Sequence, residues 1–412
     1  MRVDMMRRVD RWCGVPLCFL LTVWRRLAGE RRAASSPRQI LCIQTAEMGS
    51  LVLALPAVRH LERAHPGVVV HMLVFRTIAG AVPAIGLAPA ERVIAIDPSS
   101  LFTIARDTLR FMGEARRRRI DTVVNLEMFA RFGALLAYLS GAARRAGFHA
   151  FGHPGLYCGD LLTHRVIYNP HIHTAEALLT IARSLEEDPA HVPMGKLARR
   201  SLGEGGFPGG GGLSVSRMSS DATARDRMQT RLAAAAPAAV GRRLIVINPN
   251  ASQLIPIRRW PIESYAALVA RLLEDPKNAC VLTGTADEQP DTRFIVDRVR
   301  SDRIVDLAGK TTIGDLLDLY NVADLLVTND SGPAQIAALA SVKILVFFGP
   351  ETPALYRPLA EPERCRVLYS QYACSPCVTA FNQRKTDCTD NQCLKVIDVE
   401  TVHRNALEML VG

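Results

Sequence analysis

The sequence predicts an α/β fold in which two Rossmann-like, doubly wound parallel-sheet domains face each other across a cleft. The chain has 412 residues, more than one hydrophobic core usually holds, so two domains are expected. Strand-like apolar segments alternate with helical patterns in two separate series, which is typical of parallel sheets covered by helices. Apolar residues make up 49% of the chain and aromatic residues 6%, as in soluble α/β proteins.

Four parts are expected along the chain. Residues 1–36 form a basic and apolar N-terminal segment, and residues 37–185 form the first Rossmann-like domain. Residues 186–242 are interpreted as a linker with an insertion, because GEGGFPGGGG (Gly203 to Gly212) cannot pack a core. Residues 243–412 form the second Rossmann-like domain.

The elements follow in order from the periodicity of apolar residues. In the first domain we expect strands over residues 39–44, 68–75, 91–97 and 121–127, and helices over residues 51–64, 78–85, 108–117 and 134–139. In the second domain we expect strands within residues 242–250, 278–284, 303–309, 324–330 and 343–350, and helices over residues 264–273, 313–323 and 333–340. Ligands of such sheets bind at the carboxyl ends of the strands.

Positive charge is concentrated at the N-terminus of a chain whose formal net charge is +10. Arginines flank the apolar run from Trp12 to Trp24, which is shorter than the roughly 20 residues of a membrane-spanning helix. The pattern favours a helix at the membrane surface over a cleaved signal peptide, and a helix packed on the protein's own surface is the alternative. Basic and aromatic residues do not interleave, so no nucleic acid partner is expected.

Three turns of the second domain carry candidate phosphate-binding groups. TNDSGPAQ (Thr328 to Gln335) joins a strand to a helix that Ser331 and Gly332 would open, and its amides would form an anion site. An ordinary helix cap without ligand is the alternative. NPNASQ (Asn248 to Gln253) precedes Arg258 and Arg259, which can bind a diphosphate. LTGTADE brings the backbone of Gly284 to the same edge, with Asp287 or Glu288 for a ribose or base. Together the turns predict a nucleotide-phosphate pocket.

Several common enzyme motifs are absent from the sequence. It contains no GxxxxGK[ST], no GxGxxG directly after an expected strand, no GxSxG and no HExxH. The sequence therefore gives little support for a P-loop protein, a classical dinucleotide-binding protein, a serine hydrolase or a zinc protease.

Three segments give the sequence a recognisable likeness: QILCIQTAEMGSLVLALPAVRHLERAHP, NPNASQ…RRWPIESYAALVARL, and DLAGKTTIGDLLDLYNVADLLVTNDSGPAQIAALASVKILVFFGPETPALYRPL. They resemble glycosyltransferase family 9, the heptosyltransferase-like family, from about Arg38 to the C-terminus. The resemblance implies a GT-B fold and an inverting glycosyl transfer that needs no cofactor for catalysis. It also implies a cytoplasmic enzyme, peripheral on the cytoplasmic membrane. The donor would be a nucleotide-diphosphate sugar, with an ADP-sugar such as ADP-heptose favoured, and the acceptor a lipopolysaccharide-like glycolipid or polysaccharide. The candidate donor-binding residues are Asn250, Ser252, Arg258, Gly284, Asn329, Asp330, Ser331, Gly332 and Gln335.

Two positions depart from the family pattern. Ser50 stands where the family usually has an aspartate that acts as general base, and a serine hydroxyl is no base without a partner. Glu47, on the same turn, and Glu127, at the end of a strand, are the replacement candidates; for Glu47 a solvated loop glutamate is the alternative. Gln335 replaces a histidine beside the donor phosphates and loses its titratable charge.

Four cysteines gather in CSPCVTAFNQRKTDCTDNQC, within residues 374–393. Cys374, Cys377, Cys388 and Cys393 could hold a structural zinc ion, although four-cysteine zinc sites usually have two closely spaced pairs. Reduced thiols and disulfides are the alternatives, and a cytoplasmic location disfavours disulfides.

Two other functions compete with an active glycosyltransferase. Ser50 and Gln335 favour a catalytically silent sugar-nucleotide-binding or scaffold protein of envelope glycan assembly. An epimerase of the UDP-sugar 2-epimerase type shares the two-lobed fold, but the NDSGP and FGPET segments argue against it.

Overall fold

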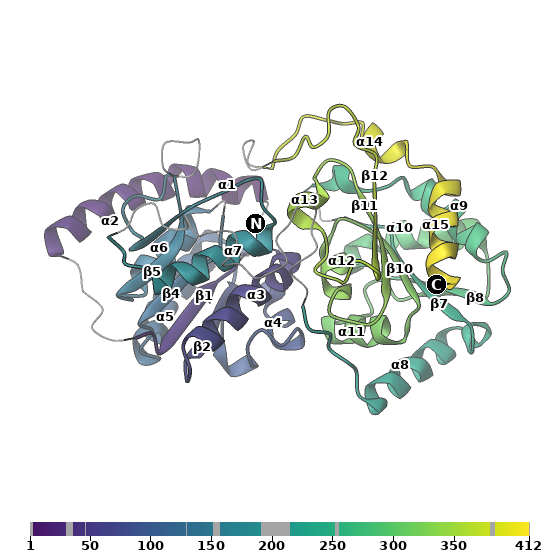
Figure 1. Ribbon diagram of the computed structural model, residues 1–412, viewed down its shortest axis with the longest axis horizontal. Helices are drawn as coiled ribbons and strands as arrows, with labels where there is room; N and C mark the ends of the chain where they lie inside the picture. Colours follow the sequence, from purple (N-terminus) through teal and green to yellow (C-terminus); the bar gives the residue numbers. More distant parts are fainter. Residues whose placement is uncertain are drawn as a thin grey trace. The chain divides into compact units, whose positions relative to one another are not determined.

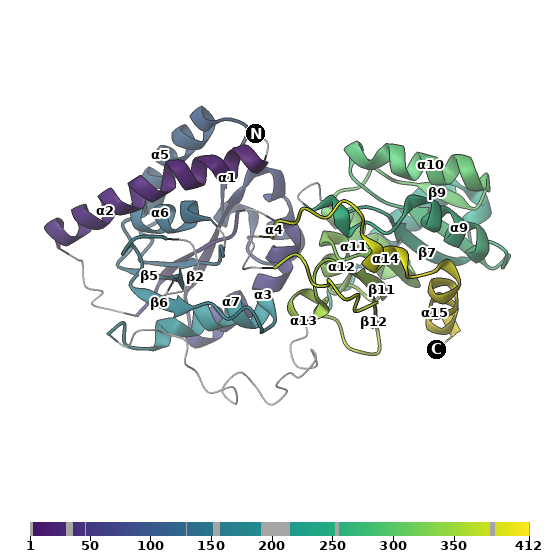
Figure 2. The ribbon, with the colours of Figure 1, turned by 90° about the horizontal axis from the view of Figure 1, so that it is seen from above.

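The protein divides into two compact units, residues 1–206 and 207–412 (Figure 1). The computed structural model describes residues 3–29, 36–45, 47–128, 130–150, 157–190, 215–251, 255–379 and 384–411. Each unit contains one six-stranded sheet with helices on both of its faces (Figure 2). The prediction of two Rossmann-like α/β units is confirmed.

Unit 1 begins with two helices that precede its sheet. Its α-helices are α1 (Val3–Trp12), α2 (Gly14–Ala28), α3 (Met48–Ala64), α4 (Ala81–Ala84), α5 (Leu101–Arg117), α6 (Arg131–Leu139) and α7 (Thr174–Arg183). Its strands are β1 (Gln39–Ile43), β2 (Val69–Phe75), β3 (Val93–Ile96), β4 (Thr122–Asn125), β5 (Arg144–His149) and β6 (His164–Ile167). Short 3-10 turns lie at Arg76–Ile78, Ala90–Arg92 and Ser184–Glu186.

The sheet of unit 1 has the order β3-β2-β1-β4-β5-β6, and every neighbouring pair is parallel. The chain moves outward from β1 to β3 and then crosses to β4, so the strand order reverses between β1 and β4. Helices α5 and α6 cover one face, while α3 and α7 pack together on the other (Figure 2). The loops that follow β1 and β4 therefore meet at the point where ligands of such sheets bind.

Unit 2 repeats this design. Its α-helices are α8 (Ala222–Ala235), α9 (Ile262–Leu272), α10 (Gln289–Val299), α11 (Ile313–Val322), α12 (Gly332–Ala337), α13 (Pro353–Tyr356), α14 (Gln392–Lys395) and α15 (Val399–Val411). Its strands are β7 (Arg243–Asn248), β8 (Asn278–Leu282), β9 (Ile304–Asp306), β10 (Leu325–Asn329), β11 (Lys343–Phe348) and β12 (Cys365–Tyr369), with 3-10 turns at Pro237–Ala239, Pro256–Arg258 and Ala286–Glu288. The sheet order is β12-β11-β10-β7-β8-β9, again all parallel.

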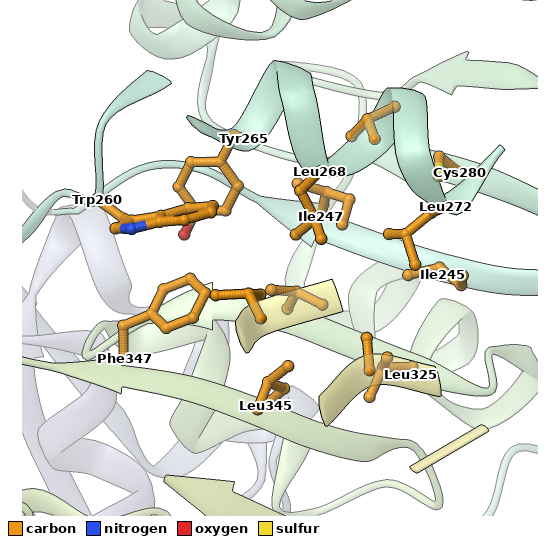
Figure 3. Close-up of a cluster of buried hydrophobic side chains, with 14 of the residues drawn as sticks. Ile245, Ile247, Trp260, Tyr265, Leu268, Leu272, Cys280, Leu325, Leu345 and Phe347 are labelled. Carbon is orange, nitrogen blue, oxygen red and sulfur yellow. The ribbon is translucent and has the colours of Figure 1, made fainter. Parts of the chain in front are cut away.

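A hydrophobic core of unit 2 lies between its sheet and helices α9 and α15 (Figure 3). Trp260 packs against Tyr265 of α9 and Phe347 of β11, with ring centroids 4.9 and 5.0 Å apart. The indole Nε1–H of Trp260 donates to the carbonyl of Ile397 at 2.8 Å. A buried aromatic ring fixed in this way also fixes the backbone beside it. The core thus holds the segment that carries Arg258 against the sheet edge.

Several elements differ from the sequence-based expectation. The helix expected over residues 78–85 is reduced to a 3-10 turn and the four-residue α4. Strands β5, β6 and β12 were not anticipated. By contrast, the alanine-rich helix expected within residues 186–242 is present as α8, although the rest of that expected linker lies partly outside the described residues. That helix packs against α11, with an ion pair from Arg231 to Asp315 at 3.5 Å.

The N-terminal segment forms the two consecutive helices α1 and α2. Asp10 of α1 accepts a hydrogen bond from the backbone N–H of Phe132 at 3.0 Å and pairs with Arg131 at 3.1 Å. It thereby satisfies a free amide at the start of α6, as a capping side chain does. In the described part of the chain, no helix has the length and apolar character needed to cross a membrane.

Candidate functional site

The candidate site of unit 2 lies where its strand order reverses, between β7 and β10. The segments that follow β7, β10 and β11 meet there, because the carboxyl ends of neighbouring parallel strands share one edge. The 3-10 turn Pro256–Arg258 and the cysteine-rich loop of residues 374–393 also reach this edge.

Four charged side chains form a cluster at this edge. Nη1 of Arg258 lies 3.4 Å from Oδ2 of Asp330 and 3.8 Å from Oε2 of Glu351. Nε of Arg384 lies 2.8 Å from Oε1 of the same glutamate. Arg258, Asp330 and Glu351 are 6%, 5% and 1% exposed, so the cluster is shielded from water. Two cations and two carboxylates balance each other, which makes their joint burial tolerable.

The cluster perturbs the carboxyl group of Asp330. Its pKa is raised to about 7, chiefly by burial and also by the charge of Glu351, while Arg258 and Arg384 act to lower it. Near neutral pH the group can therefore either donate or accept a hydrogen bond. Nε of Arg258 and Oε2 of Glu351 have no hydrogen-bond partner among the described residues. The arrangement leaves polar groups that a ligand with anionic oxygens and hydroxyls can engage.

Asn329 braces the loop that follows β7. Its Nδ2 donates to the carbonyls of Pro249 and Asn250 at 3.0 and 3.1 Å. Its Oδ1 accepts from the backbone N–H of Trp260 at 2.9 Å. Both ends of the amide are thus used in tying the end of β10 to the loop after β7 and to the start of α9. The side chain positions the site's backbone.

Unlike Asn329, Asn250 does not use its side-chain amide in hydrogen bonds to the described residues. Its side chain is 2% exposed, and neither Oδ1 nor Nδ2 has a hydrogen-bond partner in the described ranges. A Cβ atom on Gly284 would come within 3.0 Å of that Nδ2 and 3.2 Å of a carboxylate oxygen of Glu288. A side chain at this position would therefore crowd the amide. A buried amide without partners is costly unless a ligand or water completes it.

The segment after β10 leads directly into α12, a helix of six residues. Ser331 precedes it, and its hydroxyl donates back to the carbonyl of Asn329 at 3.2 Å. Gly332 is the first helical residue, and a proline follows as expected for a first turn. Nε2 of Gln335 donates to the carbonyl of Tyr356 at 2.7 Å, whereas its Oε1 is buried without a partner in the described part.

Beyond β8 the edge continues into a shallow pocket of about 520 Å³. It is lined by Ala286, Asp287, Gln289, Pro290, Arg293, Asp306 and Lys310. Glu288 does not line it, because its carboxylate caps the turn by accepting from the N–H of Thr285 at 2.8 Å. Of the two acidic side chains expected to meet a ribose or base, Asp287 is therefore the one that faces a pocket.

The cysteine-rich loop packs against the site. Asn391 donates to the carbonyls of Ile257 and Arg259 at 2.9 and 2.7 Å and so brackets Arg258. Cys393 is buried against Gly349, where an added Cβ would lie 2.9 Å from its Sγ. Burial, and to a smaller extent the neighbouring cysteines, raise the pKa of its thiol to about 11.

The four cysteines are not disulfide-bonded: Cys374 and Cys388 are exposed, Cys377 is half-buried and Cys393 is buried. Within the described ranges no three His, Cys, Asp or Glu side chains are arranged to hold a metal ion. A tetrahedral zinc site would need all four sulfurs to converge on one point.

In unit 1 the candidate carboxylates belong to neighbouring loops. Oε1 of Glu127 accepts from the hydroxyl of Thr45 at 2.7 Å, from the backbone N–H of the same residue, and from Gln44 at 3.4 Å. Its carboxylate, 8% exposed, thus holds the turn between β1 and α3. Glu47 occupies the N-cap position of α3 and is half-buried, and its carbonyl accepts from the N–H of Ser50 at 3.1 Å.

All but one of the donor-site residues chosen from the sequence lie among the described residues of unit 2. The structure places eight of the chosen residues at the carboxyl edge of the unit 2 sheet. Asn250, Gly284, Asp330 and Ser331 lie in loops, Arg258 ends a 3-10 turn, Asn329 ends β10, and Gly332 and Gln335 belong to α12. Ser252 lies outside the described residues. Sequence reasoning missed Glu351 and Arg384. The FGPET segment was a signal for the first, whereas nothing in the local pattern marked the arginine of the cysteine-rich loop.

Comparison with known proteins covers the two units differently. Residues 212–386 match the sequence profile of "Glycosyltransferase family 9 (heptosyltransferase)". A Campylobacter jejuni protein described as lipooligosaccharide heptosyltransferase 2 is 28% identical over 172 residues, which is 41% of this chain and 52% of that protein. The chain spans about half or less of the length of the curated relatives it matches.

Solved structures extend the likeness to both units. The E. coli ADP-heptose lps heptosyltransferase II superposes with a TM-score of 0.69 at 18% identity, covering 90% of this chain and 98% of that one. An E. coli heptosyltransferase bound to ADP-2-deoxy-2-fluoro heptose gives 0.59 at 16% identity, covering 90% and 99%. At this identity the likeness shows the fold, which is GT-B.

Proposed function

Because the chain is a divergent, heptosyltransferase-like member of glycosyltransferase family 9, we propose that it transfers a sugar from a nucleotide-diphosphate sugar to a lipopolysaccharide-like envelope glycan. An ADP-sugar is the favoured donor and heptose the favoured sugar, since one structural neighbour is described with ADP-2-deoxy-2-fluoro heptose and relatives are named heptosyltransferases. The transfer inverts the anomeric centre and needs no metal for catalysis.

The observation that carries this proposal is the buried polar group at the switch point of unit 2. The amide of Asn250 has no partner among the described residues, and it lies beside a glycine at the edge that also carries Arg258. Such unsatisfied groups suit the oxygens of a bound nucleotide diphosphate, because a buried polar group left unpaired costs free energy. Arg258 then stabilises the charge that develops on the leaving diphosphate.

The base of the proposed reaction is Glu47. It lies on the turn that carries Ser50, where the family's aspartate is usually found, and it is only half-buried. Glu127 is the weaker candidate, because three donors already hold its carboxylate. A base must reach the acceptor hydroxyl, and a carboxylate committed to a turn is poorly placed to do so.

Donor binding is tested by a thermal-shift screen of the full chain against ADP-, UDP-, GDP- and CMP-sugars. Selective stabilisation by ADP-sugars is expected, because a ligand that binds only the folded state raises its stability. Asn250→Ala should abolish that shift, whereas Asn405→Ala, on α15, should leave it unchanged. A folded protein that responds to none of the four sugars would contradict the proposal.

A catalytically silent donor-binding protein is the second candidate, favoured by Ser50 and Gln335. The two candidates differ in a transfer assay with ADP-heptose and a lipopolysaccharide core acceptor that lacks heptose. Turnover by the wild type supports the enzyme. Donor binding without turnover, together with turnover gained by Ser50→Asp, supports the silent protein.

We also propose that the protein lies on the cytoplasmic face of the membrane and that the four cysteines have a structural role. A zinc ion held by Cys374, Cys377, Cys388 and Cys393 would need the loop to rearrange so that the thiols converge. Metal analysis of the purified chain, and of a variant with all four cysteines replaced by serine, tests the zinc. Equal metal content in the two would exclude it.

A further inference from the structure

Helix α2 is built with its apolar side outward. Its exposed residues are Pro16, Leu17, Phe19, Leu20, Val23, Trp24 and Leu27, together with the small or charged Arg26 and Ala28. Leu27, Trp24 and Leu20 are 80%, 64% and 61% exposed, and Trp12 at the end of α1 is 76% exposed. We call Trp12, Leu17, Phe19, Leu20, Val23, Trp24 and Leu27 the outer apolar face. An ordinary surface helix turns such residues inward.

The inner side of α2 is small and polar. Gly14, Cys18 and Thr22 recur every four residues and are buried, as one side of a helix requires. The hydroxyl of Thr22 accepts from the backbone N–H of Asp160 at 2.8 Å. Arg25 pairs with the carboxylate of the same aspartate at 2.9 Å. Polar contacts, together with the packing of Cys18 and Leu21 against α6 and Leu161, therefore attach the helix to unit 1. The residues of the outer apolar face stay exposed.

The attachment is close enough to fix the orientation of α2. Cβ atoms added to Gly14 and Gly159 would lie 3.2 Å from Arg131 and 2.4 Å from Thr22, respectively. Cys18 packs with Leu135 of α6 and with Leu161. In both ribbon views α1 and α2 run along the outside of unit 1 as consecutive helices beside α6 (Figures 1 and 2). The outer apolar face is thus a fixed feature of a folded unit.

Positive charge borders this face. Arg8, Arg11 and Arg26 are exposed and Arg7 is half-buried. The sequence contains no acidic residue between Arg11 and Arg26. Asp10, the one described acidic side chain of α1, is paired with Arg131. Apolar side chains with tryptophans and a one-signed basic border match the surface of a bilayer that contains anionic lipids.

We propose that the outer apolar face seats unit 1 on an anionic bilayer, with α2 lying in the plane of the interface. The 15 residues of α2 extend about 22 Å, short of the roughly 30 Å hydrocarbon core, so the helix lies on the membrane and does not cross it. Leu20, Trp24 and Leu27 enter the boundary between headgroups and acyl chains. The bordering arginines bind lipid phosphates.

Binding of α1 and α2 to a bilayer would also affect the candidate site in unit 1. Asp10 contacts the start of α6, which follows β4 and Glu127 in the chain, so α1 lies at the carboxyl edge of the sheet. A bilayer beneath α1 and α2 would bring a lipid-anchored acceptor to that edge. This consequence rests on the proposed function, whereas membrane binding itself does not.

Vesicle co-sedimentation of the full chain tests the proposal without any activity readout. We expect binding to vesicles of equal parts phosphatidylcholine and phosphatidylglycerol, and little binding to phosphatidylcholine alone. The triple variant Leu20→Ser, Trp24→Ser, Leu27→Ser and the double variant Arg8→Glu, Arg26→Glu should each weaken binding by about tenfold or more. The matched controls are Val240→Ser with Phe294→Ser, and Arg298→Glu, which change exposed residues of unit 2 and should bind as the wild type does.

Tryptophan fluorescence identifies the segment that touches lipid. The chain has three tryptophans, of which Trp12 and Trp24 are exposed and Trp260 is 1% exposed. Brominated acyl chains should quench the wild type strongly. Trp24→Phe should keep vesicle binding and lose part of the quenching.

Three results would overturn the proposal. One is a wild-type protein that stays in the supernatant with both kinds of vesicle, and a second is a triple variant that binds as tightly as the wild type. A third result would be a wild-type dimer that the triple variant converts to monomer, with no vesicle binding by either, which would assign the outer apolar face to a second copy of the chain. Thermal unfolding of every variant shows that it is folded before its binding is compared.

Discussion

Arg384 of the cysteine-rich loop donates from Nε to Oε1 of Glu351 at 2.8 Å, across 33 residues of sequence. Its guanidinium also lies over the ring of Tyr356, 5.2 Å from the centroid. Glu351 in turn faces Arg258 of the candidate donor site. The cysteine-rich loop therefore takes part in setting the charge of that site, in addition to covering it.

Removal of Arg384 should destabilise unit 2. Arg384→Ala leaves the buried carboxylate of Glu351 with Arg258 alone, and breaking a buried ion pair costs about 3 kcal/mol. Urea denaturation measures the loss. Arg293→Ala, which breaks an exposed pair with Asp297, should cost less than about 0.5 kcal/mol. The double variant Arg384→Met, Glu351→Gln should recover part of the lost stability. If the free energy of unfolding of Arg384→Ala equals that of the wild type, the pair with Glu351 does not stabilise unit 2.

Asp330 should make stability depend on pH between about 4 and 7. Burial raises the pKa of its folded-state carboxyl to about 7, above the roughly 3.9 of an unfolded aspartate. Its contribution is therefore fully present below the unfolded pKa and is lost as pH rises through the folded pKa. The free energy of unfolding of the wild type should fall relative to that of Asp330→Asn across this range, by a few kcal/mol at most. Parallel pH profiles of the two proteins would contradict this assignment.

Asn329 should matter for stability and for donor binding together. Asn329→Ala removes two donated hydrogen bonds and one accepted bond, and at about 1 kcal/mol each the loss is about 3 kcal/mol. The loop that presents Asn250 also loses its brace, so the thermal shift with an ADP-sugar should disappear. Asn405→Ala, at a half-buried position on α15, removes two hydrogen bonds and should cost about 2 kcal/mol at most, with the thermal shift unchanged. Retained nucleotide binding by a folded Asn329→Ala would show that the brace is dispensable.

Gly159→Ala should loosen α2 from unit 1. The glycine has φ of 60°, and an added Cβ would lie 2.4 Å from the Thr22 hydroxyl and 2.6 Å from the carbonyl oxygen of Cys18. Backbone strain and the clash together should cost about 2–3 kcal/mol. Gly67→Ala separates backbone strain from the clash, because φ of Gly67 is 81° and no atom lies within 4 Å of an added Cβ. This variant should cost only about 1 kcal/mol. Equal melting temperatures of the two variants would mean that the contact with α2 contributes nothing.

Glu47→Gln should abolish turnover and leave donor binding intact, with a rate loss of about a hundredfold or more, as for a lost general base. Glu127→Gln is the matched control. It should keep turnover but lower stability by about 1–3 kcal/mol, because its carboxylate holds the turn between β1 and α3. A transfer assay with an ADP-sugar and urea denaturation provide the two readouts. Loss of turnover in Glu127→Gln, with turnover kept in Glu47→Gln, would instead identify Glu127 as the base.

Much of the fold could be predicted because central parallel strands are continuous apolar runs. Strands such as β7, β10 and β11 are buried along almost their whole length, and their composition marks them. The edge-side strand β5 escaped because its sequence RRAGFH contains charge and glycine. Arg145 is buried there only because its guanidinium donates to the carbonyls of Leu161 and Ala142, at 2.7 and 2.5 Å. A contact of that kind leaves no trace in local periodicity.

By itself, the sequence determined the two Rossmann-like units and the turns that carry the candidate donor site, because strand and helix periodicity and glycine-rich turns are local properties of the chain. Only the tertiary structure decided that Asn329 is a brace while Asn250 is left unpaired, since both are asparagines in polar turns. It also brought Arg384 to Glu351 and turned the apolar side of α2 outward. Each of these depends on which groups meet across the fold, and hydrogen bonds and ion pairs between distant segments follow from packing that no single segment encodes.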